Sequence, residues 1–253
     1  MTSPDPVHPP VTLRHNGGPP WVIAHRGASA RRPENTLSAF LAAWHAGVVW
    51  VEADTQPTAD GVPVLLHDRD LDRTTTGRGP VRAARRRDVA RLTVRGWPGE
   101  WVPRLAELLA MLTPTRALLL ELKGYHTSAQ IRNVLAEVDQ AGVADRVLLQ
   151  SFEVEVLREL HRADPDRAFG LLVTELDADP VARCRDLGAS YYNPSAGALL
   201  RRPDVVTALH AAGIGVACWT SDDPSQWAAL AGAGVDAIIT NRPAELAAWQ
   251  RRR

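Results

Sequence analysis

Short apolar segments alternate with amphipathic segments along almost the whole chain, and this alternation constrains the fold more than any other feature. The stretches between the apolar segments carry apolar residues at helical spacing, as at Leu37, Phe40, Leu41 and Trp44. Eight apolar segments have the length of a buried strand: 22–24, 49–51, 117–122, 147–150, 168–173, 190–193, 214–219 and 237–240. Strands that alternate with helices predict an α/β protein with a parallel sheet.

The number of strands and the chain length together favour a closed barrel. A (β/α)₈ (TIM) barrel needs about 250 residues, and this chain has 253. An open doubly wound sheet is the alternative, but its glycine-rich turn, G-x-G-x-x-G, is absent. We therefore predict a single (β/α)₈ TIM barrel over residues 21–250, preceded by a proline-rich flexible tail over residues 1–20. An extended piece at 62–66 opens a short insertion after the second strand, and Asn35 is the expected N-cap of the first helix.

Composition excludes several classes of protein. Lys and Arg total 29 and Asp and Glu total 29, so nothing suggests the basic footprint of a nucleic-acid-binding domain. Cys184 and Cys218 lie within apolar runs and are expected in the core. No window approaches the roughly 20 apolar residues of a membrane helix, and no signal peptide is evident. We expect a cytoplasmic protein.

Acidic side chains gather where the early strands end, which is where barrel enzymes place their catalytic groups. Glu52 and Asp54 are two residues apart and so point to the same side of a strand. Together with Glu121 on the next main strand they form an oxygen-rich set that suits a hard cation such as Mg²⁺ or Ca²⁺. The alternative is that these carboxylates only form salt bridges with nearby cations.

Two histidines and two cations accompany the acids. His25 and His67 each follow an apolar run, and a pair of imidazoles can exchange protons near neutrality; taken singly, each could be a hydrogen-bonded structural histidine. Arg26 and Lys123 suit an anionic ligand such as phosphate, although both could simply neutralise the carboxylates. Lys123 is the only lysine in the chain.

An ordered set of motifs resembles the glycerophosphodiester phosphodiesterase family. The resemblance runs from about residue 22 to residue 243, and the set as a whole is specific although each piece is weak. The motifs are His25-Arg26-Gly27, Pro33-Glu34-Asn35-Thr36, Glu52-x-Asp54, Thr58-x-Asp60-Gly61, His67-Asp68, Arg73-Thr74-Thr75, Pro103-x-Leu105-x-Glu107, Glu121-x-Lys123, Gln150-Ser151-Phe152, Trp219-Thr220 and Gly234-Val235-Asp236-x-Ile238-Ile239-Thr240.

The resemblance implies metal-dependent hydrolysis of glycerophosphodiesters to glycerol 3-phosphate and an alcohol. It implies roles for eight residues: metal ligands Glu52, Asp54 and Glu121, an acid/base pair His25 and His67, phosphate-binding Arg26 and Lys123, and Trp219 against the glycerol. Val49, Ala53 and Asp222 depart from the family's usual residues but lie outside this chemical set. The insertion over 68–101 is expected to influence the choice of alcohol.

Three rival functions remain open at this stage. A lysophospholipase D-type activity would cut an acyl-bearing substrate and needs an apolar groove. A non-catalytic barrel could bind phosphate or a polyol, although it would have no use for both histidines and all three carboxylates. An aldolase or isomerase barrel would need a carbonyl-directed base and gives no reason for two histidines.

Overall fold

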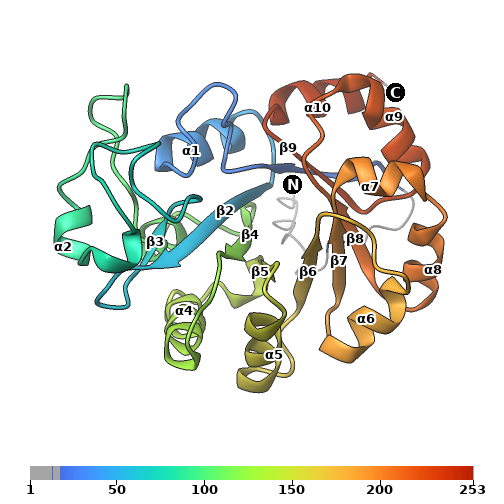
Figure 1. Cartoon of the computed structure of the whole chain (residues 1–253). Helices are drawn as coiled ribbons and strands as arrows, with labels where there is room; N and C mark the ends of the chain where they lie inside the picture. The colour runs from blue at the N-terminus through green and yellow to red at the C-terminus, as the bar shows by residue number, and fades with distance from the viewer. Residues whose placement is uncertain (1–12, 14–17, 253) are drawn as a thin grey trace, which may run out of the picture.

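A computed structural model describes residue 13 and residues 18–252 of the chain. Eight parallel strands close into a barrel, because β1 pairs both with β2 and with β9 (Figure 1). The strands of the barrel are β1 (Trp21–Ala24), β2 (Trp50–Pro57), β4 (Ala117–Leu122), β5 (Val147–Ser151), β6 (Phe169–Val173), β7 (Tyr191–Pro194), β8 (Gly215–Cys218) and β9 (Ala237–Thr240). This confirms the predicted TIM barrel.

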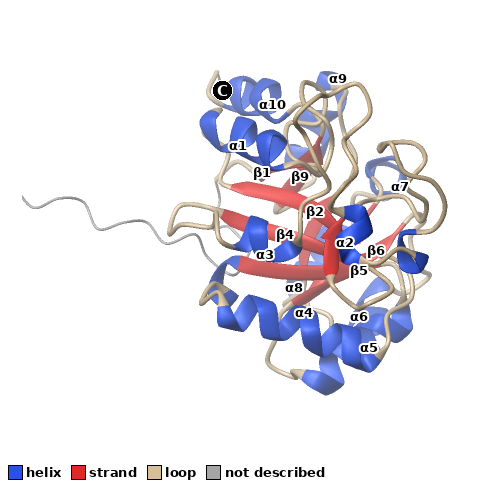
Figure 2. Ribbon diagram, turned by 90° about the vertical axis from the view of Figure 1, so that its left-hand side faces the viewer, coloured by secondary structure: helices blue, strands red, loops and turns tan. Residues whose placement is uncertain are grey.

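Helices surround the strands. Figure 2 shows the strands in the middle of the molecule, with α1 and α10 above them and α4, α5 and α6 below. The helices are α1 (Leu37–His45), α2 (Arg86–Val89), α3 (Leu105–Leu109), α4 (Ser128–Gln140), α5 (Val154–Ala163), α6 (Pro180–Leu187), α7 (Ala196–Arg201), α8 (Val205–Ala211), α9 (Pro224–Gly232) and α10 (Pro243–Gln250). None of these described helices is long and apolar enough to span a membrane.

Alternate residues of each strand fill the inside of the barrel. Ile23, Trp50, Leu119, Leu148 and Ile239 belong to one buried interior cluster. The residues between them face the helices and join the larger core. Because side chains alternate along a strand, the interior residues lie two positions before polar residues near the carboxyl ends of the same strands. The apolar interior therefore supports a polar layer at that end.

The insertion after the second strand is a small layer beside the barrel. Strand β3 (Pro63–Leu65) pairs antiparallel with the end of β2, as expected for an extended piece outside the ring. The segment continues through a 3₁₀ turn at Val81–Ala83 and then α2. It has its own buried cluster, which includes Val64, Leu71 and Val102.

Some local predictions differ from the structure. Thr36, not Asn35, is the N-cap of α1, and its side chain accepts a hydrogen bond from the amide of Ala39. Asn35 adopts a left-handed backbone, with φ of 58°, and its side chain is used elsewhere. The short helix α7 was not predicted. The two cysteines are buried and free, as predicted.

The expected N-terminal tail lies mostly outside the described residues. Leu13 is the exception within residues 1–17: it is fully buried in the interior cluster, and its amide donates to the hydroxyl of Tyr191 at 2.8 Å. Pro19 and Pro20 are also described. The boundary between tail and barrel at residue 20 stays a prediction.

Gly27 allows the loop after β1 to pack closely on α1. Its φ is +82°, and a Cβ at this position would lie 2.6 Å from the backbone carbon of Ala39. Only glycine accepts both the left-handed backbone and this close approach. The turn places Arg26, whose φ is 54°, over the carboxyl end of the barrel.

Candidate active site

The site forms where the inward-facing positions of the strands change from apolar to polar. Asp54 and Glu121 lie side by side in the β2–β4 register, and Glu121 is next to Gln150 on β5. His25 directly follows β1, Trp219 follows β8 and Asn241 follows β9. The barrel therefore brings together, at its carboxyl end, side chains from strands that are far apart in the sequence.

Three buried carboxylates form the floor of the site. Glu52, Asp54 and Glu121 are at most 6% exposed, and each offers an oxygen within 4.8 Å of the others. Burial, followed by the charges of its two neighbours, raises the pKa of Glu52 well above its usual range. Burial and Asp54 raise the pKa of Glu121 to about 8. Burial opposes ionisation of Asp54 as well, but Arg26, His67, Lys123 and the hydrogen bond from Asn35 together outweigh it and lower the pKa of Asp54.

Two cations lie against these carboxylates. Arg26 Nε is 3.2 Å from Asp54 Oδ2, and its backbone amide donates to Glu52 Oε2 at 3.0 Å. Lys123 Nζ is 2.9 Å from Glu121 Oε1 and 3.8 Å from Asp54 Oδ1. The salt bridges considered as an alternative in the sequence are thus present. They neutralise only part of the charge, since three carboxylates face two cations.

The site chemistry fits a hard divalent cation. Oδ1 of Asp54 is buried and has no hydrogen-bond partner among the described residues. Asn35 occupies the other oxygen, donating from Nδ2 to Oδ2 at 2.8 Å. Three carboxylates that converge within a few ångströms, with raised pKa values on two of them, are the oxygen donor set that Mg²⁺ or Ca²⁺ prefers. The residues present would hold such an ion through Glu52, Asp54 and Glu121.

His25 is oriented by a neutral amide. Its Nδ1 lies 2.8 Å from Asn241 Oδ1, and Asn241 donates to Asp222 from both its side-chain Nδ2 and its backbone amide, at 2.6 and 2.7 Å. A carboxylate only accepts, so Asp222 turns the Asn241 oxygen toward His25. Nδ1 of His25 therefore carries the proton, and Nε2 faces the pocket with a lone pair. Burial, together with Arg26, lowers the pKa of His25 to about 4.

His67 is oriented by a carboxylate instead. Its Nδ1 lies 2.8 Å from Asp68 Oδ1, which leaves Nε2 for the pocket. Gln56, in β2, donates from Nε2 to the carbonyls of His67 and its two neighbours, Leu66 and Asp68, at 2.6 to 3.2 Å. The strand therefore fixes the backbone of His67, and Asp68 fixes its ring.

A pocket of about 210 Å³ contains these groups. One wall is aromatic: Phe152 packs edge-on against Trp219, with ring centroids 5.3 Å apart. Lys123 Nζ lies 5.5 Å from the centre of the Phe152 ring, and Trp219 Nε1 donates to the carbonyl of Asn193 at 2.8 Å. The lining residues are His25, Arg26, Glu52, His67, Glu121, Lys123, Gln150, Phe152, Leu172, Trp219 and Ile239.

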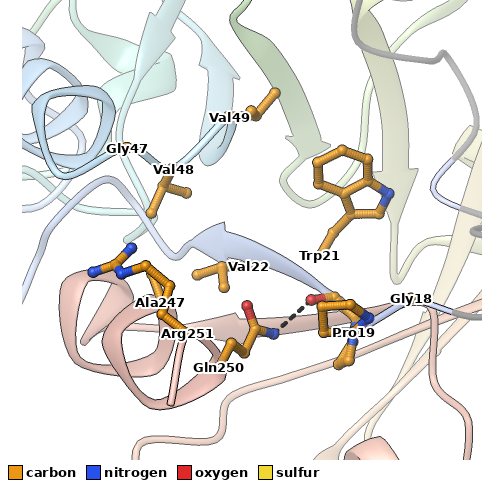
Figure 3. A pocket seen from close by; sticks show the side chains of 11 residues that line it. Gly18, Pro19, Trp21, Val22, Gly47, Val48, Val49, Ala247, Gln250 and Arg251 are labelled. Atoms are coloured by element: carbon orange, nitrogen blue, oxygen red, sulfur yellow. Dashed lines mark hydrogen bonds between the residues drawn. The ribbon is translucent and has the colours of Figure 1, made fainter. Parts of the chain in front are cut away.

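A larger hollow of about 500 Å³ lies at the opposite end of the barrel. Figure 3 shows Trp21 and Val22 of β1 on one side of it and Ala247 and Gln250 of α10 on the other. Gln250 Nε2 donates to the carbonyl of Pro20 at 2.7 Å. The described residues that line it include no acid and no histidine, so the catalytic chemistry belongs to the smaller pocket.

The structure brings seven of the eight predicted site residues to one pocket, and Asp54 lies directly beneath it, bonded to Arg26. The sequence prediction missed the residues that orient them: Glu34, Asn35, Asp68, Arg73, Asp222 and Asn241. Asn241 had a usable signal, because it follows the last strand. Asp68 follows His67 directly, which is a weaker signal.

Comparisons with known proteins show which family of sequences this chain matches. The model of the glycerophosphoryl diester phosphodiesterase family matches residues 25–245. A probable glycerophosphodiester phosphodiesterase 1 of Mycobacterium tuberculosis is 31% identical, with 92% of this chain and 93% of the relative covered. A glycerophosphodiester phosphodiesterase of Caldanaerobacter subterraneus is 30% identical, with 89% and 95% covered.

Solved structures are similar over almost the whole chain. A putative glycerophosphoryl diester phosphodiesterase from Silicibacter pomeroyi has a TM-score of 0.87 at 28% identity, and 95% of this chain and 96% of that chain are covered. A phosphodiesterase from Oleispira antarctica, in complex with the product sn-glycerol-3-phosphate, has a TM-score of 0.82 at 27% identity, with 93% and 98% covered.

Proposed function

Since the chain belongs to the glycerophosphoryl diester phosphodiesterase family and is a glycerophosphodiester phosphodiesterase, we propose that it performs this hydrolysis with a divalent metal and with His25 and His67 as an acid/base pair. The products would be glycerol 3-phosphate and an alcohol. The observation that carries the proposal is one pocket in which both imidazoles present Nε2 while two cations and three carboxylates lie beside them.

The phosphodiester group would bind between the cations. Arg26 and Lys123 point into the pocket from the loop after β1 and from the end of β4, and each can donate to a phosphoryl oxygen. A divalent ion held by Glu52, Asp54 and Glu121 would supply Lewis-acid polarisation of that phosphoryl group when bound. The aromatic wall of Phe152 and Trp219 would pack against the carbon atoms of the glycerol.

The two histidines differ in the partner of Nδ1, and this difference favours one assignment of roles. His25 faces a neutral amide, and its lowered pKa of about 4 keeps the ring neutral near pH 7, so Nε2 can accept a proton from the nucleophile. His67 donates from Nδ1 to the Asp68 carboxylate, so Nε2 is the nitrogen that can donate a proton to the leaving alkoxide. We assign His25 as the base and His67 as the acid. The nucleophile would be water or the glycerol 2-hydroxyl.

The size of the pocket favours a small diester over an acyl-bearing one. Its 210 Å³ are below the roughly 300–1,000 Å³ of sites for drug-sized ligands. A glycerophosphoryl group fills such a space, and the alcohol would extend outward. A lysophospholipase D-type activity would need an apolar groove leading from this pocket.

Purified wild type, His25→Ala and His67→Ala should be assayed on glycerophosphocholine with and without chelator. We expect turnover by the wild type in Mg²⁺ or Ca²⁺, loss in chelator, and a decrease of about 10²- to 10⁴-fold in each variant. An active chelated enzyme would refute metal dependence. Near-wild-type turnover in either variant would refute the role of that histidine. Preferred cleavage of lysophosphatidylcholine would support the alternative substrate.

A further inference from the structure

A chain of charged side chains connects His67 to Arg26 across the start of the insertion. Asp68, the partner of His67, receives two hydrogen bonds from Arg73: Nε donates to Oδ2, and Nη2 donates to Oδ1 at 2.9 Å. Arg73 also donates from Nη1 and Nη2 to the two oxygens of Glu34, at 2.8 and 2.7 Å. Glu34 accepts from Arg26 Nη1 at 3.0 Å. One guanidinium therefore holds two carboxylates, and each carboxylate contacts a group of the active site.

The geometry points to Asp68 and Arg73 as positioning residues for His67, with Arg73 acting through Asp68. The inference rests on the proposed function of His67 as an acid/base group. Asp68 is an acceptor only, so the contact at Nδ1 places the ring proton there and leaves Nε2 to exchange a proton with the substrate. Arg73 keeps both oxygens of Asp68 in place, so the carboxylate cannot rotate away from the ring.

The charges in this chain are mutually supporting. The hydrogen bonds from Arg73 hold the pKa of Asp68 well below its usual range, and Glu34 and Asp68 together raise the pKa of Arg73. Asp68 therefore stays ionised over the whole working pH range. The side chain of Arg73 is 49% exposed, and single exposed salt bridges contribute little stability. Its paired hydrogen bonds to Asp68 on one side and Glu34 on the other instead fix the orientation of the Asp68 carboxylate. A positioning role requires this fixed orientation.

Substitution of Asp68 by asparagine has a specific expected consequence. Asp68 offers two acceptors, Oδ1 to His67 and Arg73 Nη2 and Oδ2 to Arg73 Nε. Asparagine has only one oxygen, so its NH₂ group would face a donor in either orientation. The contact at His67 Nδ1 would be weakened if the oxygen stays on the ring and lost if the NH₂ group faces it. Without that acceptor the ring cannot keep Nδ1 protonated while Nε2 donates its proton. Removal of Arg73 frees the asparagine to turn its oxygen back to His67. Loss of Arg73 should therefore partly rescue the asparagine variant.

The experiment compares kcat and KM on glycerophosphocholine for Asp68→Asn, Arg73→Met and the double variant. Arg69→Met is the matched control, because Arg69 is exposed in the same segment and has no ion pair with the described residues. We expect kcat to fall about 10- to 100-fold in Asp68→Asn, part of the roughly 10²- to 10⁴-fold that a positioned general acid contributes. The decrease in kcat should be smaller in Arg73→Met than in Asp68→Asn, and KM should change little in both. The kcat of the double variant should be higher than that of Asp68→Asn.

Three outcomes would overturn the inference: a kcat of Asp68→Asn equal to that of Arg69→Met, losses that simply multiply in the double variant, or an effect confined to KM. Thermal unfolding of each variant separates loss of folding from loss of positioning. If Asp68→Asn does not fold, the kcat of Arg73→Met against Arg69→Met decides. His67→Ala is measured in parallel: if it is inactive while Asp68→Asn is not, the proposed function stands and only this inference fails.

Discussion

The metal-free protein should become less stable as the pH rises, because Glu121 is buried among like charges. Burial, and after it the charge of Asp54, raises the pKa of Glu121 from 4.5 to about 8. An acid with a raised pKa holds its proton more tightly in the folded chain than in the unfolded chain, so the free energy of unfolding declines between these two values. One full proton is worth about 1.4 kcal/mol per pH unit. From about pH 5 to about pH 8 the decline therefore reaches at most about 4 kcal/mol.

Glu121→Gln isolates this contribution, because glutamine has the same shape and does not titrate. Other groups also change with pH. Burial lowers the pKa values of His25 and His126 from 6.5 to about 4, so their contribution makes the folded state more stable as the pH rises between these two values. The quantity to compare is therefore the difference between variant and wild type at each pH. In chelator the variant should match the wild type near pH 5 and exceed it by up to about 4 kcal/mol near pH 8.

Thermal unfolding followed by circular dichroism measures the difference. For a chain of this length about 1 kcal/mol corresponds to about 2–4 °C, so the midpoint of Glu121→Gln should lie roughly 8–15 °C above that of the wild type near pH 8. Glu155→Gln, on the exposed face of α5, is the control. Added Mg²⁺ or Ca²⁺ should stabilise the wild type more than Glu121→Gln, by binding the folded state. A difference that does not depend on pH would refute the reasoning.

Three further perturbations test the same site. Lys123→Arg keeps the charge but replaces the compact ammonium that lies between Glu121 and the Phe152 ring, so kcat/KM should fall about tenfold or more. Asn241→Leu removes the acceptor for His25 Nδ1 and should lower kcat about 10- to 100-fold with little change in folding. Gly170→Ala would place a Cβ 2.4 Å from Asn193 Nδ2; chemical denaturation should show a loss of about 1–3 kcal/mol.

The sequence predicted the barrel well because the same local pattern recurs in every unit. Each strand is a short apolar run, and each run ends at a polar residue such as His25 or Glu121 that marks the carboxyl end. The predicted site residues follow from that rule together with the family motifs. Lys123 also stood out because the chain otherwise uses arginine, and the structure places it between two carboxylates.

The partners of several orienting residues could not be predicted because the contacts that define them are distant in sequence. His25 and Asn241 are 216 positions apart, and no local pattern joins them. Asn35 shows the same limit at short range: asparagine favours both an N-cap and a left-handed backbone, and its two contacts with Asp54 decide between them. Thr36 then serves as the N-cap of α1. Local propensity offered two conformations, and tertiary contacts selected one.

The balance of charge in the pocket gives a reason for this arrangement of residues. Three carboxylates and the two cations Arg26 and Lys123 leave one negative charge when all are ionised. A divalent cation held there would turn this into one positive charge, and a phosphodiester, which is a monoanion, would then bring the pocket to neutrality. A phosphomonoester product carries close to two negative charges at pH 7, so its binding leaves a buried excess of negative charge, which is costly. With such an ion bound, the same residues that attract the diester would therefore favour release of the monoester.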